Sequence, residues 1–106
     1  MNKLRFYRDQ EHAPRAEGSD EHSSQLARLL ESDIQDDVVA CRELLDNIHG
    51  LSRENDRISR TGNSFNITLT PRRTTLRNLS LETGENYILD TGRVERALQE
   101  WLNFIT

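Results

Sequence analysis

The chain has little of what builds disulfide-bonded, metal-binding or membrane-spanning proteins. Its single cysteine, Cys41, excludes an internal disulfide and a cysteine-based zinc site. No segment approaches the roughly 20 consecutive apolar residues that a transmembrane helix needs. Lys3 and Arg5 interrupt any hydrophobic signal sequence at the start of the chain. These absences favour a cytoplasmic protein that is not embedded in a membrane.

Residue patterns typical of catalysis are also missing. His12, His22 and His49 lie far apart and give no ligand pair spaced for one helical face. The chain has no glycine-rich phosphate loop and no nucleophile motif. Cys41 is in phase with apolar helix residues, which indicates a core side chain rather than a nucleophile. The sequence therefore predicts a protein that is not an enzyme, with no catalytic residue, metal site or cofactor.

Length and composition predict one domain over residues 1–106 with a modest core. Hydrophobic residues make up 34% and charged residues 30% of the 106 positions. A domain of this size buries only about two-thirds of its unfolded surface, so a partner or a second copy could add to its stability. A homodimer is therefore one possible state, and the sequence leaves the oligomeric state open.

The first half of the chain predicts a strand followed by helix. Residues 4–8 have strand propensity and open an N-terminal strand-and-loop region over 1–19. In the helical region 20–50, apolar residues recur every three or four positions from Leu26 to Ile48. Gly50 marks the end of this region. Ser32 and Asp33 could cap a second helix, so one long helix and two shorter ones both remain open.

The second half predicts a hairpin and a final helix. Phe65, Ile67 and Leu69 alternate with polar residues, and Pro71 marks a turn within the hairpin at 62–81. We expect these three residues and Leu76 to face the core, and a bulge or the strand's end to follow Leu76. Residues 87–89 could add a short strand. A C-terminal helix over 91–105, capped by Asp90 or Thr91, should bury Trp101.

These elements predict an α+β fold. The expected architecture is a small antiparallel sheet, formed by the hairpin at about 64–81 and the N-terminal strand, packed against an acidic helix and the C-terminal helix.

Opposite charges are segregated along the chain, although the net charge is only −4. Residues 20–56 carry a formal charge of −7, which predicts an acidic partner-binding face made of Glu31, Asp33, Asp36, Asp37, Glu43 and Asp46. Such a face speeds association with a basic partner. As surface residues, Asp33, Asp36, Asp37 and Glu43 should tolerate reversal to lysine without loss of the fold.

Residues 57–81 carry a charge of +5 and contain no acidic residue. They supply an alternative, basic face made of Arg57, Arg60, Arg72, Arg73 and Arg77. These arginines could contact nucleic acid, pair with the acidic helix or guard a strand edge. The acidic pI of about 5.3 and the lack of an outward aromatic residue for base stacking weigh against nucleic acid.

Two short groups of residues carry family resemblances. Phe6-Tyr7-Arg8-Asp9, His49-Gly50-Leu51, Arg60-Thr61-Gly62 with Phe65, and Arg77 together resemble the YacL-type family of small bacterial proteins. The hairpin with the helix ending in Trp101-Leu102-Asn103-Phe104-Ile105 resembles small immunity proteins. The second resemblance implies a cytoplasmic, acidic, non-enzymatic protein that protects bacteria from a toxin. Neither resemblance supplies catalytic residues.

The sequence thus predicts a small acidic protein-binding domain, most concretely an immunity protein that neutralises a basic toxin or nuclease. The alternatives are a YacL-like regulatory module and nucleic-acid contact through the arginine-rich hairpin. The identity of the partner and the charged surface that binds it remain open.

Overall fold

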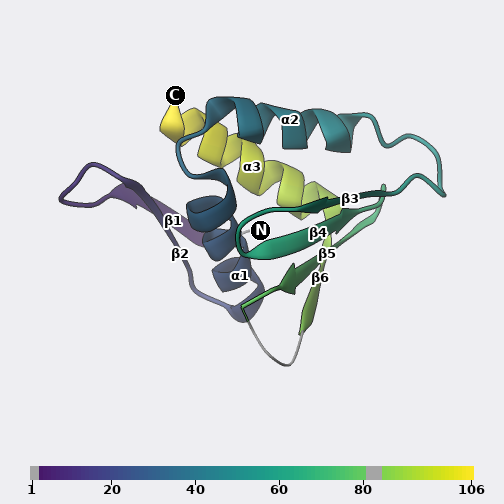
Figure 1. Cartoon of the computed structure of the whole chain (residues 1–106), viewed down its shortest axis with the longest axis horizontal. Helices are drawn as coiled ribbons and strands as arrows, with labels where there is room; N and C mark the ends of the chain where they lie inside the picture. The colour runs from purple at the N-terminus through teal and green to yellow at the C-terminus, as the bar shows by residue number, and fades with distance from the viewer. Residues whose placement is uncertain (1–2, 81–84) are drawn as a thin grey trace.

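The computed structural model describes residues 3–80 and 85–106 of the chain (Figure 1). Its elements, in chain order, are β1 (Leu4–Arg8), β2 (Pro14–Gly18), α1 (Glu21–Leu29), the π-helical turn η1 (Leu30–Ile34), α2 (Val38–His49), β3 (Ile58–Thr61), β4 (Phe65–Leu69), β5 (Arg73–Asn78), β6 (Asn86–Asp90) and α3 (Thr91–Ile105). The expected α+β fold class is confirmed.

Strands β3 to β6 form one antiparallel sheet in sequence order. Ile67 pairs with Leu76, and both are buried together with Phe65 and Leu69, so the predicted inward register of the hairpin is confirmed. Strand β5 ends at Asn78, which fulfils the expectation that the strand stops after Leu76. Strand β3 was not predicted, because an edge strand pairs on one side only and its exposed residues show no apolar alternation.

The N-terminal strand does not join this sheet, contrary to expectation. It pairs with β2 in a separate two-stranded sheet, and β2 lies in a region predicted as loop. The Asp9 carboxylate accepts hydrogen bonds from the backbone N–H groups of Glu11 and Ala13, which turns the chain back on itself directly after β1. Strands β1 and β2 form a hairpin that extends at the left of Figure 1, and we call it the β1–β2 arm. Only Ala16 of β2 is fully buried, so its sequence lacked a strand pattern.

The helical region contains two helices separated by η1. Helix α2 begins after Asp37, whose carboxylate accepts a hydrogen bond from the Ala40 N–H at 3.0 Å. Asp37 is therefore the cap, in place of the expected Ser32 or Asp33. Helix α2 ends at His49 as predicted from Gly50, and α3 spans the predicted residues.

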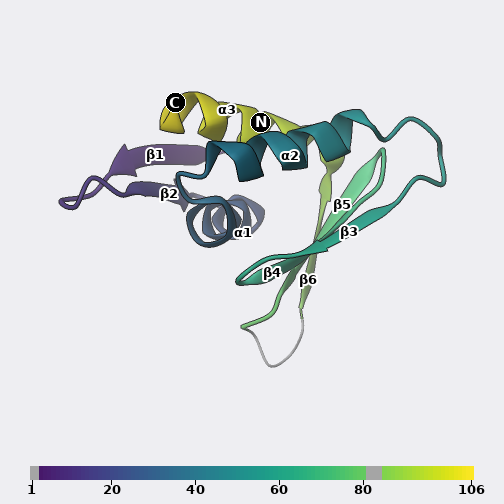
Figure 2. The same cartoon turned by 45° about the horizontal axis from the view of Figure 1, so that its top comes forward.

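The three helices lie on one side of the four-stranded sheet (Figure 2). Side chains from the helices and the inner sheet face form a single core in which Trp101 and Phe65 are the largest fully buried residues. The expected burial of Trp101 is confirmed. Within the described residues, no helix is long and apolar enough to cross a membrane.

Candidate functional site

The turn η1 connects the two sheets through two carboxylates. Toward the two-stranded sheet, Glu31 accepts a hydrogen bond from the Ala16 N–H on β2 at 2.6 Å and another from Arg15 Nε at 3.2 Å. Asp33 accepts from the N–H groups of Ser64 at 2.8 Å and Phe65 at 3.1 Å, where β4 begins. Residues two apart on a helical turn point to opposite sides. The carboxylates therefore bind one sheet each.

Trp101 supports the end of the same turn. The Gln35 N–H donates to the Leu30 carbonyl oxygen at 2.7 Å, the wide spacing of a π-helix. Gln35 has a left-handed φ of 57°, and its carbonyl oxygen accepts a hydrogen bond from Trp101 Nε1 at 2.7 Å. We refer to Glu31, Asp33, Gln35 and Trp101 together as the π-junction. It joins both sheets to α3.

A glycine in the β3–β4 turn allows the close approach to Asp33. A Cβ atom added at Gly62 would lie 2.5 Å from Asp33 Oδ2. A side chain there would push the carboxylate away from the N–H groups of Ser64 and Phe65. Gly62 is thus part of the reason that Asp33 can bind the hairpin.

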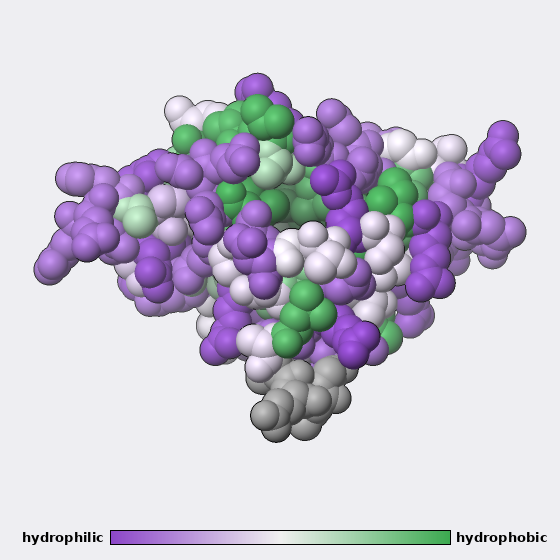
Figure 3. Space-filling view, viewed as in Figure 1, coloured by the Kyte–Doolittle hydropathy of each residue, from purple (hydrophilic) through white to green (hydrophobic). Residues whose placement is uncertain are grey.

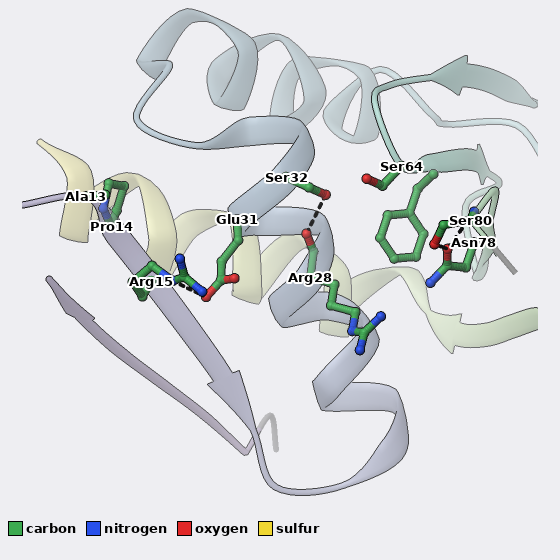
Figure 4. A pocket seen from close by; sticks show the side chains of 10 residues that line it. Ala13, Pro14, Arg15, Arg28, Glu31, Ser32, Ser64, Asn78 and Ser80 are labelled. Atoms are coloured by element: carbon green, nitrogen blue, oxygen red, sulfur yellow. Dashed lines mark hydrogen bonds and ion pairs between the residues drawn. The ribbon is translucent and has the colours of Figure 1, made fainter. Parts of the chain in front are cut away.

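An open groove of about 500 Å³ runs beside the π-junction, between the β1–β2 arm and the ends of β4 and β5 (Figure 4). Arg15 and Glu31 bind each other at its arm side. Ser32 donates its hydroxyl hydrogen to the Arg28 carbonyl oxygen at 2.7 Å. Ser80 similarly donates to Asn78 Oδ1 at 2.6 Å. Much of the polar lining is therefore used in internal hydrogen bonds, and we assign the groove no reaction.

The six predicted acidic residues do not form one face. Glu31 and Asp33 belong to the π-junction, and Asp37 caps α2. The remaining three, Asp36, Glu43 and Asp46, are exposed on or just before α2. The structure thus separates carboxylates that hold the fold from carboxylates that face solvent.

Two of the exposed acids share a helical stripe with an exposed apolar side chain, which also has the exposed Arg42 three residues along the helix. Val39 is 64% exposed, and it shares a helical stripe with Glu43 and Asp46, four and seven residues later. Asp36 precedes the first turn of the helix. We call Asp36, Val39, Glu43 and Asp46 the α2 outer face. Figure 3 shows hydrophobic surface over the first turns of α2, beside hydrophilic groups. Arg60 approaches Glu43 at 3.7 Å in an exposed ion pair.

The five predicted basic residues do not form one face either. Arg60 points toward α2, where its Nη1 donates to Asn47 Oδ1 at 2.9 Å. Arg73 and Arg77 lie on the outer face of the four-stranded sheet, two strand positions on either side of Thr75. Arg57 and Arg72 are exposed in the segments that precede β3 and β5. Only Arg73 and Arg77 therefore share a strand face.

Cys41 is a core residue, as predicted. Its side chain is fully buried, and Sγ lies 3.4 Å from the Leu98 carbonyl oxygen. Burial raises the pKa of the Cys41 thiol to about 11, so the thiol stays protonated at neutral pH. His49 lies at the end of α2, and its Nε2 contacts Glu95 on α3 at 2.8 Å. Among residues 3–80 and 85–106, no three His, Cys, Asp or Glu side chains are grouped for metal binding.

Comparison with protein-family models, with curated proteins and with solved structures finds no match for this chain. The two family resemblances stay predictions.

Proposed function

We propose that the chain is a non-enzymatic protein-binding domain that binds a basic protein through the α2 outer face. One observation carries the proposal: Val39 is 64% exposed on α2, Glu43 and Asp46 follow it on the same helical stripe, and Asp36 is exposed just before the helix. This arrangement fits a partner that has an apolar pocket with cationic side chains at its rim.

The two kinds of side chain would contribute differently to binding. Exposed carboxylates raise the rate of association with a cationic protein. They also disfavour binding of acidic proteins to the same surface. Burial of an apolar side chain by the partner removes it from water and stabilises the complex. Val39 would thus mainly slow dissociation, whereas the three acids would mainly speed association.

The α2 outer face is held in place before any partner binds. Asp37 caps the helix, and buried residues of the opposite side, including Cys41 and Leu45, pack into the core. A surface that is already ordered loses little conformational entropy on binding. Binding through α2 would therefore require little ordering of its backbone.

The most concrete version of this proposal is an immunity protein that acts in the cytoplasm on a basic toxin or nuclease. An enzyme that holds a phosphate backbone needs positive charge, so an acidic protein can compete for the same surface. A YacL-like regulatory module would use the same α2 outer face with a different basic partner.

The test uses two charge-reversal variants with the same change in net charge. In the first, Asp36, Glu43 and Asp46 are replaced by lysine. The control replaces Glu11, Glu54 and Glu100, which are exposed elsewhere on the surface. Wild type and both variants are used for affinity capture from the host, and proteins found by mass spectrometry are then purified and titrated at two ionic strengths.

A basic protein whose association slows at least about tenfold with the first variant, and much less with the control, would support the proposal. Its association with wild type should also slow as salt rises, because salt screens exposed charges. Equal rates for the two variants would overturn it. Capture of nucleic acid that depends on Arg73 and Arg77 would favour the alternative, sheet-face function.

A further inference from the structure

The free edge of strand β6 presents unpaired backbone groups. The Thr91 N–H donates to the Arg72 carbonyl oxygen at 2.9 Å, which fixes the alternation of bonded pairs between β5 and β6. By this alternation, the backbone groups of Tyr87 and Leu89 face β5. Those of Asn86 and Ile88, together with the Asp90 N–H, face away from it. Within the described residues, no strand pairs with this edge.

The side chains of β6 do not protect this edge. Ile88 is 54% exposed on the outer sheet face. The strand contains no proline or lysine, the residues that commonly guard exposed edges. An open concavity of about 280 Å³ borders the strand and is lined in part by His22, Ile88 and Asp90. The end of β6 can therefore be reached from solvent.

The other edge of the same sheet differs. Strand β3 has four residues, and its central residues Ser59 and Arg60 are polar and exposed. Arg60 also crosses to Asn47 and Glu43 on α2. A short polar edge beside arginine side chains disfavours pairing with another strand. The difference between the two edges therefore predicts that a strand of another chain pairs with β6 and not with β3.

We propose that a second copy of this chain pairs with β6 in antiparallel orientation, so that the two sheets become continuous. With the two-fold axis at Ile88, the Ile88 residues of the two copies form a hydrogen-bonded pair. Asn86 then stands opposite Asp90 of the second copy. Unlike a register with the axis at Tyr87 or Leu89, this one places the two exposed Ile88 side chains directly opposite each other.

The side chains in this register are self-complementary. The two Ile88 side chains lie next to each other on the outer face and remove apolar surface from water. Arg77 is the β5 neighbour of Asn86, so it lies on the same row as Asp90 of the second copy. The row therefore runs from Arg77 through Asn86 to Asp90 of the second copy, which is followed by its own neighbour Arg73.

The dimer would leave the α2 outer face free. Arg60 connects α2 to β3, and β3 is at the opposite edge of the sheet from β6. The two surfaces are therefore independent, and each dimer would carry two copies of the α2 outer face. This proposal and the proposed function can fail separately.

The experiment measures the mass of the full chain by sedimentation velocity from low micromolar to millimolar concentration. Wild type should shift from monomer to dimer. Ile88→Lys should remain a monomer, since it places two like charges at the axis. Val39→Lys is the matched control on the α2 outer face and should dimerise as wild type does. Circular dichroism checks that both variants are folded.

Asn86→Lys tests the register. The new lysine is close to Arg77 in the monomer and gains an opposite charge, Asp90 of the second copy, only in the dimer. Its dimer dissociation constant should fall about threefold or more. In a parallel measurement, amide exchange at Ile88 should slow at least about tenfold at high concentration, whereas exchange at Ser59 on β3 should not change.

A wild-type chain that stays monomeric at millimolar concentration would overturn the proposal. A dimer that survives Ile88→Lys would place the interface elsewhere. A dimer that Asn86→Lys does not tighten would contradict the Ile88 register. If Ile88→Lys does not fold, the exchange at Ile88 and the response to Asn86→Lys still decide the question.

Discussion

The π-junction and the α2 outer face use the same kind of side chain for opposite purposes. The carboxylates of Glu31 and Asp33 accept hydrogen bonds from backbone N–H groups of two different sheets. Glu43 and Asp46, ten or more residues later, face solvent from a regular helix. The difference lies in what each carboxylate can reach. The widened helical turn lies between the edge of β2 and the start of β4, where backbone N–H donors are within reach, whereas the outside of α2 faces solvent.

This contrast predicts that mutations at the two regions separate stability from binding. Changes at the π-junction should lower the free energy of unfolding, because they leave buried or half-buried polar groups without partners. Changes on the α2 outer face should alter binding and leave folding nearly unchanged.

The largest effect is expected for Trp101→Ala, which removes the largest fully buried side chain and the hydrogen bond to Gln35. It should lower the free energy of unfolding by about 3–5 kcal/mol in urea denaturation. Trp101→Phe keeps most of the ring packing and removes the N–H donor. Its loss should be smaller, about 1–3 kcal/mol, and combines the lost hydrogen bond with the small cavity that phenylalanine leaves. A loss below about 1 kcal/mol for the alanine variant would contradict the core position.

Asp33→Ala should cost about 2–3 kcal/mol, because the N–H groups of Ser64 and Phe65 lose a charged acceptor. Gly62→Ala should destabilise the same contact by displacing the Asp33 carboxylate. In the double variant, the two losses should not add, since both remove one interaction. Additive losses in urea denaturation would show that Gly62 acts independently of Asp33.

The inner side of α2 gives a pH-dependent prediction. Burial raises the pKa of Cys41 to about 11, above the ordinary value of 9.0 in the unfolded chain. Below pH 9 both states keep the thiol protonated. As pH rises from 9 toward 11, the unfolded thiol ionises first, so the free energy of unfolding should decline in this window. Cys41→Ala should lose that part of the pH dependence, and an unchanged slope would contradict the assignment.

Asp37→Ala tests whether the beginning of α2 depends on its cap. Removing the side-chain hydrogen bond to the Ala40 N–H should cost about 1 kcal/mol. Asp37→Asn should restore most of the stability, because asparagine is an equally good cap. A full loss with asparagine would mean that the negative charge matters more than the hydrogen bond.

The sequence predicted the parts of the fold that depend on local periodicity. The alternation of Phe65, Ile67 and Leu69 predicted the buried strand face, and the apolar stripe from Val94 to Ile105 predicted α3 with its bounds. Strands β2 and β3 were missed. Each lies at a sheet edge and has only one fully buried residue or none, so period-two alternation never develops.

The two-way division of the acidic residues could not be predicted from the sequence. The acidic face was predicted from formal charge and from its position opposite the apolar residues, and neither reveals a π-helical turn before Gln35. The π-helical turn and the positive φ of Gln35 at its end interrupt the regular helix, and Asp33 and Asp37 on either side of Gln35 accept hydrogen bonds from backbone N–H groups. The expectation that reversing Asp33, Asp36, Asp37 and Glu43 leaves the fold intact is therefore revised: Asp33 and Asp37 have structural hydrogen bonds.

The smallest change in stability is expected on the α2 outer face. Val39→Ser and Asp46→Ala should each shift the free energy of unfolding by no more than about 0.5 kcal/mol, because both side chains are exposed. Binding of the captured partner should nevertheless weaken with either substitution. A loss of stability comparable to that of Asp33→Ala would show that the outer face also holds the fold.

The most direct test compares two triple-alanine variants in urea denaturation. One replaces Glu31, Asp33 and Asp37, and the other replaces Asp36, Glu43 and Asp46, so both remove the same charge from the same region. We predict a loss of about 3–5 kcal/mol for the first and a change within about 1 kcal/mol for the second. Equal losses would contradict the division of the acidic residues into a π-junction with its neighbouring cap and a partner-binding face.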